Sequence, residues 1–94
     1  METVHSINLI VSNPDVRSGR PTIVGTGVTV EDIAISKIYH RQDVDSIANG
    51  YDLSLAQVHA ALAYYYDHKT EIDTNIRERH RVADELKEQF GGSQ

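Results

Sequence analysis

The sequence predicts a small, mainly α-helical domain in which a short N-terminal strand and a β-hairpin precede a bundle of three or four helices. Three observations support this prediction. The chain has 94 residues and no cysteine, so we expect one domain without disulfides. β-Branched runs broken by glycine and proline turns are confined to residues 1–30. Beyond residue 30, apolar residues recur every three or four positions, as they do on the buried face of a helix.

The first 30 residues predict extended chain interrupted by turns. The apolar run at residues 7–12 predicts a strand that the Asn-Pro-Asp sequence at 13–15 ends. The Gly-Thr-Gly sequence at 25–27 predicts a sharp reversal, because glycine adopts positive φ without steric cost. β-Branched residues at 23–24 and 28–30 flank it and predict the two arms of a hairpin. The N-terminal strand has few partners within one chain, so we expect it to pair across a dimer.

Two helices are predicted next from their N-caps. Thr29 is followed three residues later by Asp32, a weaker form of a capping box, and predicts a first helix over residues 30–40. Asp43 predicts the start of a short second helix. We expect Gly50 to end this helix in the left-handed conformation.

A third helix begins at the clearest start signal in the chain. Ser54 and Gln57 have the spacing of a capping box. With the second helix and the short connection at residues 49–53, this helix predicts a helix-turn-helix, so that residues 30–69 form the core. Residues 70–90 predict an amphipathic last helix, which either starts anew near Thr70 or continues the third helix.

Two segments resemble a known family. They are NPDVRSGRPTIVGTGVTVEDI and VDSIANGYDLSLAQVHAALAYYYDH, and with the preceding strand they cover about residues 7–70. They resemble the small bacterial family named domain of unknown function 433 (DUF433). The resemblance implies a homeodomain-like helix-turn-helix and an antitoxin of a type II toxin–antitoxin pair, whose toxin is a PIN-like nuclease. Gly27 stands where such proteins commonly carry an arginine, so the resemblance does not extend to an anion contact by that arginine.

The helix-turn-helix predicts two sets of candidate DNA contacts. At the start of the third helix these are Ser54, Gln57 and His59, and Gln57 can pair with adenine through two hydrogen bonds. Lys37 and Arg41, four residues apart on the first helix, could form a phosphate-binding patch with two arginines of the preceding turns. The full set is Arg17, Arg20, Lys37, Arg41, Ser54, Gln57 and His59. The net charge of −5 and the lack of Arg or Lys between residues 42 and 68 favour the alternative of a helical bundle with a solvated polar face.

Candidate protein interfaces lie on the last two helices. Three consecutive tyrosines cannot all face one core, so we expect Tyr64 or Tyr66 to lie at a dimer contact. In the last helix an apolar stripe includes Ile76, Ala83, Leu86 and Phe90, with Arg79 as its polar exception. Such a stripe packs within the chain, pairs with a second copy or lies in a groove on a partner, and the sequence does not separate these alternatives.

Other function classes are not expected. The five histidines are scattered without metal-ligand spacing, and the acidic and hydroxyl residues form no recognisable catalytic group, so we expect no metal, cofactor, catalysis or small-molecule substrate. The chain shows no signal peptide or membrane span, and we expect a cytoplasmic homodimer. Our first hypothesis is an antitoxin-like protein that neutralises a PIN-like nuclease through its last helix and represses its own operator DNA. The alternative is a protein-interaction or dimerisation module without DNA binding.

Overall fold

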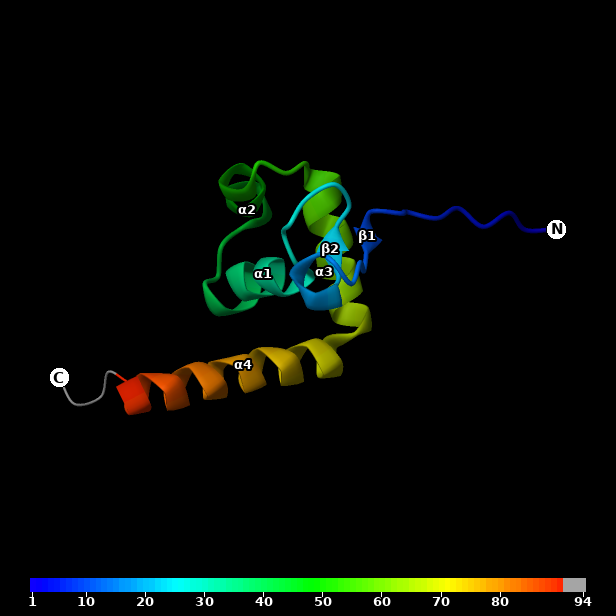
Figure 1. Cartoon of the computed structure of the whole chain (residues 1–94). Helices are drawn as coiled ribbons and strands as arrows, with labels where there is room; N and C mark the ends of the chain where they lie inside the picture. The colour runs from blue at the N-terminus through cyan, green and yellow to red at the C-terminus, as the bar shows by residue number, and fades with distance from the viewer. Residues whose placement is uncertain (91–94) are drawn as a thin grey trace.

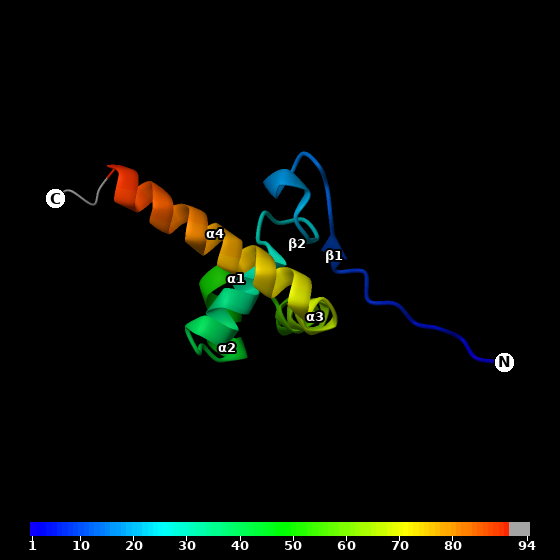
Figure 2. The ribbon, with the colours of Figure 1, turned by 90° about the horizontal axis from the view of Figure 1, so that it is seen from below.

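The computed structural model describes residues 1–90 and confirms a mainly helical fold with a short two-stranded antiparallel sheet at its N-terminal end (Figure 1). Three helices, α1 to α3, form a compact bundle, and a long fourth helix, α4, crosses below them (Figures 1 and 2). Two further turns are labelled η1 and η2. In chain order the elements are β1 (Ile10–Val11), η1 (Arg17–Gly19), β2 (Thr22–Ile23), α1 (Val30–Ala34), η2 (Ile35–Tyr39), α2 (Val44–Tyr51), α3 (Leu55–Asp67) and α4 (Lys69–Phe90).

The sheet differs from the expected hairpin. β1 pairs with β2, with Ile10 opposite Ile23, so the N-terminal strand finds one partner within the chain. The Gly-Thr-Gly turn at residues 25–27 does reverse the chain, and Gly25 has a φ of +76°. Its two arms form only the single bridge between Thr22 and Thr29, because the chain enters α1 directly after it.

The N-caps predicted for the helices are confirmed. The Thr29 hydroxyl accepts from the Asp32 N–H at 3.0 Å, and the Asp32 carboxylate accepts from the Thr29 N–H at 3.2 Å. The Asp43 carboxylate accepts from the Ser46 N–H at 2.8 Å, a hydrogen bond that lowers the pKa of the Asp43 carboxyl. Each of these interactions spans three residues, so each is encoded locally.

The first helical stretch ends within one residue of the prediction, whereas the second helix ends at a different residue from the one predicted. α1 continues into the wider π-helical turn η2, so the first helical stretch ends at Tyr39. Gly50 lies inside α2, and the left-handed position is occupied by Asp52, with φ 57° and ψ 50°. Aspartate is one of the few residues other than glycine that adopt this conformation with some frequency, because its short polar side chain can hydrogen-bond to the local backbone.

The break between α3 and α4 falls at His68, which settles the open question of one helix or two. The His68 ring stacks on Tyr64 with centroids 4.0 Å apart. The buried Tyr65 hydroxyl donates to Asp73 at 2.7 Å, and the Lys69 ammonium donates to the other oxygen of that carboxylate at 2.7 Å. These contacts fix the direction in which α4 leaves α3.

One apolar core joins these elements. Ile23 of β2, Ile33 of α1, Ile47 of α2 and Val58 of α3 are all fully buried in it. Ile76 belongs to the same cluster, so the first half of α4 is part of the folded body.

Candidate functional site

The helix-turn-helix presents few free groups at the start of α3. Ser54 and His59 are exposed, as expected. The Gln57 side chain, however, accepts from the Ser54 N–H at 2.7 Å, while the Ser54 hydroxyl accepts from the Gln57 N–H at 3.1 Å. The two residues form a complete capping box. Pairing Gln57 with adenine through two hydrogen bonds would therefore break the cap that begins α3.

The four predicted phosphate-binding cations occupy different settings. The Arg17 Nε donates to the Gly27 carbonyl at 2.9 Å, which braces η1 against the Gly-Thr-Gly turn. Lys37 lies near Asp43 and contributes to the lowering of the pKa of that carboxyl. Arg41 lies beyond the end of η2 and has a φ of +55°, so Lys37 and Arg41 do not share a helix face as predicted.

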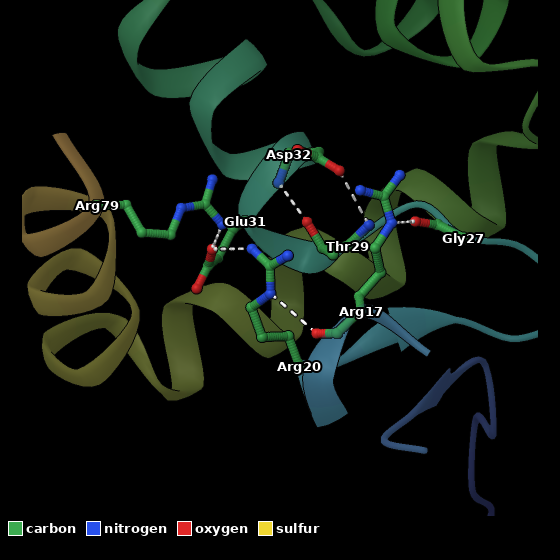
Figure 3. A network of polar contacts seen from close by, with 7 residues as sticks. All are labelled: Arg17, Arg20, Gly27, Thr29, Glu31, Asp32 and Arg79. Carbon is green, nitrogen blue, oxygen red and sulfur yellow. Dashed lines mark hydrogen bonds and ion pairs between the residues drawn. The ribbon is translucent and has the colours of Figure 1, made fainter. Parts of the chain in front are cut away.

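Arg20 is committed to an ion-pair network that the sequence analysis did not predict (Figure 3). Its guanidinium donates to the Glu31 carboxylate at 3.3 Å and to the Arg17 carbonyl at 3.0 Å. Arg79 of α4 contacts the same Glu31 oxygen. The Glu31 side chain is only 4% exposed, and this burial raises the pKa of its carboxyl, against the lowering effect of Arg20. Arg20 therefore serves the fold and is not a free phosphate contact.

This network links three separate parts of the chain. Arg20 follows η1, Glu31 lies in the first turn of α1, and Arg79 lies midway along α4 (Figure 3). The signal in the sequence was Arg79 itself, the polar exception in an apolar stripe. The Arg79 side chain is itself 42% exposed, and the buried member of the pair is Glu31, 48 residues away, whose charge needs a cationic partner.

The candidate interface residues divide into buried and exposed groups. Ile76 is 1% exposed and packs in the core, so its prediction as a partner contact is wrong. Tyr64 is half-buried against His68, and Tyr66 is exposed. Ala83 and Leu86 are exposed on α4. Phe90 ends α4, and its side chain lies outside the described part of the structure.

α4 is therefore a helix of two halves. Its first half packs on the core, and its second half extends beyond the body (Figures 1 and 2). On the extending half, Val82 and Leu86 are 41% and 50% exposed. Beside them Arg81 forms ion pairs with Glu78 and Glu85, one turn away on either side. The second half of α4 thus presents apolar side chains on a charged helix.

The part of the chain that the structure describes shows neither a metal-binding group nor a membrane-spanning helix. Its His, Asp and Glu residues form no group of three suited to holding a metal ion. Among residues 1–90, no helix combines the length and the apolar character needed to cross a membrane.

The comparison with protein families identifies this core. The family model described as "Protein of unknown function (DUF433)" matches residues 10–65, more than half of the chain. The chain belongs to the DUF433 family. The match runs from β1 to near the end of α3, so α4 lies outside the matched region. Comparison with curated proteins found no match, and comparison with solved structures found none either.

Proposed function

We propose that this DUF433 protein is an antitoxin-like binding protein that holds a PIN-like nuclease through the second half of α4. The supporting observation is the division of α4: Ile76 anchors the helix in the core, while Leu86, ten residues later, is half exposed. A helix anchored at one end keeps its exposed half ordered without a partner. The cost of ordering the chain on binding is correspondingly small.

The chemistry of this half fits binding in a groove. Leu86 lies four residues after Val82 and three after Ala83, so its side chain shares a face with both. Amphipathic helices bind in apolar grooves through anchors with this spacing. The ion pairs of Arg81 keep the flanks polar, which favours a defined orientation over general adhesion. The nuclease as partner rests on the family resemblance.

Repression of operator DNA by the helix-turn-helix is the second part of this proposal. The exposed His59 near the start of α3 supports it. The role of Gln57 in the helix cap and of Arg20 in the ion-pair network favours the alternative, an interaction module without DNA binding. A gel shift with upstream DNA at increasing salt tests this part, because phosphate contacts weaken steeply with salt. Failure to bind that DNA, with or without the partner, would refute the repressor role.

Purification of the tagged chain from its native host tests the first part. We expect a PIN-like nuclease to co-elute at defined stoichiometry. Leu86→Lys should abolish this co-elution, because it places a charge among the apolar anchors. Asp84→Lys is the matched control, since residues 84 and 86 lie on nearly opposite sides of the helix. Recovery of the chain with nothing attached, or equal effects of the two variants, would contradict the proposal.

A further inference from the structure

β1 has one edge that nothing in its own chain pairs with among the described residues. In an antiparallel pair, successive residues direct their N–H and C=O groups alternately toward and away from the partner strand. The Leu9 carbonyl accepts from the Val24 N–H at 2.9 Å, so residue 9 faces β2. Ile23 lies opposite Ile10, but its backbone groups bond within the following turn. The Ile23 N–H donates to the Val28 carbonyl at 2.9 Å, and the Ile23 carbonyl accepts from the Thr26 N–H at 3.0 Å. The N–H and C=O of Ile10 therefore point to the open edge.

A groove of about 540 Å³ lies beside this edge, between the β1 segment and the second half of α3. Its lining is mainly apolar and includes two alanines whose small side chains leave room for a neighbour. Val11 is 45% exposed on β1 itself. The lining residues are Ile7, Ile10, Ala60, Ala63, Tyr64 and Asp67.

The open edge and the extending half of α4 lie at opposite ends of the molecule. In both ribbon views β1 lies on the side of the sheet nearer the N-terminus, and the end of α4 lies on the far side of the body (Figures 1 and 2). A molecule bound at β1 would leave Leu86 accessible.

We propose that a second copy of this chain covers this edge, with its β1 antiparallel to the first and a two-fold axis at Ile10. In this register the Ile10 N–H of each copy donates to the Ile10 carbonyl of the other. Leu9 of one copy then lies opposite Val11 of the other, so apolar side chains meet on the outer face. The result is a four-stranded sheet in the order β2-β1-β1-β2.

The edge is suited to a second copy because it is self-complementary. One residue offers both a donor and an acceptor, and apolar neighbours stand on either side of it, as a two-fold interface requires. The two-fold axis runs perpendicular to the sheet, so the α3 helices of both copies lie on the same face of the sheet. The groove beside Ala60 and Ala63 then receives the second copy. A sheet of two strands with two residues each is marginal alone, and doubling it removes the exposed edge.

Sedimentation over a range of protein concentrations tests this proposal. Asn8 is exposed, and its N–H faces the same edge because it lies two residues before Ile10. Asn8→Pro removes that N–H at two symmetric positions and should weaken dimerisation by about tenfold or more. Asn8→Ala keeps the N–H and should leave the dimer intact. The proposal would be overturned if the wild type were monomeric at a concentration on the order of 100 micromolar. It would also be overturned if Asn8→Pro left the dimer unchanged, or if both variants weakened dimerisation equally.

A second pair of variants tests the groove from α3. Ala63→Glu places a charge in the groove and should also weaken the dimer. Ala56→Glu introduces the same side chain on an exposed position of α3 outside the groove and should not. Helical circular dichroism equal to wild type shows that each variant is folded. A dimer that withstands Ala63→Glu and Asn8→Pro would place the interface elsewhere.

Cysteine cross-linking tests the register. The natural chain has no cysteine, so every disulfide arises from the introduced residues. A mixture of Leu9→Cys and Val11→Cys chains should form a disulfide-linked heterodimer, since these positions face each other. Each variant alone should cross-link poorly, because its two copies lie on a diagonal about 7–8 Å apart. Efficient cross-linking of either variant alone would overturn the register centred on Ile10.

Discussion

The two halves of α4 predict losses of stability of very different size for two similar substitutions. Ile76→Ala removes three carbons from a side chain that is 1% exposed, and Leu86→Ala removes three from a side chain that is 50% exposed. Both changes lie on the same helix, and both introduce alanine, the residue with the highest helix propensity. Any difference between them therefore reports packing.

The magnitude for Ile76 follows from burial. Its loss removes buried apolar area and leaves a cavity between α4 and the core, a change that lowers the free energy of unfolding by about 2–5 kcal/mol. For a chain of this size this corresponds to a fall in Tm of about 8–40 °C. Leu86 leaves no cavity, so its replacement should change the free energy of unfolding by no more than about 0.5 kcal/mol.

Urea denaturation followed by circular dichroism at a single fixed protein concentration measures both values. The concentration must be the same because association stabilises the folded state by mass action. The extrapolated free energies and the slopes together show whether the transition remains cooperative. Equal losses for the two variants, or an Ile76→Ala variant as stable as wild type, would refute the division of α4 into a packed and an extending half.

Three further predictions follow from the caps and the buried polar groups. Ser54→Ala should lower the free energy of unfolding by about 0.5–2 kcal/mol through loss of the α3 cap, and thermal melts in which it is neutral would argue against the observed capping box. Hydrogen bonds from Lys69 and then Tyr65 lower the pKa of Asp73, so this carboxylate contributes stability above about pH 4 that is lost as the pH falls through its lowered pKa. In thermal melts across this acid range, Asp73→Asn should lose less stability than wild type as the pH falls. Parallel curves of stability against pH for the two proteins would contradict this. The raised pKa of Glu31 has the opposite sign: the stability it contributes is complete below its unfolded pKa and is lost as the pH rises through the folded value. The stability of Glu31→Gln relative to wild type should therefore increase with rising pH, and a relative stability that falls with rising pH would refute the dominance of burial.

The interactions predicted correctly from the sequence are local. The caps of Thr29, Asp43 and Ser54 join residues three apart, so the pattern contains both partners. The glycine reversal at residues 25–27 is similarly encoded by one short segment. The choice of Asp52 in place of Gly50 as the left-handed residue was not predicted, because both residues tolerate that conformation and packing of α2 decides where the helix ends.

The sequence by itself therefore determined the element types, most helix starts and the amphipathic character of the last helix. The tertiary structure decided which apolar residues of that helix are buried. The periodicity of the sequence predicts which face of the helix is apolar, but it does not predict how much of the length of that face packs against the core. It also decided that Arg20 and Arg79 meet a buried Glu31. Residues 48 positions apart approach only when α1 and α4 pack together, and no local pattern encodes their distance.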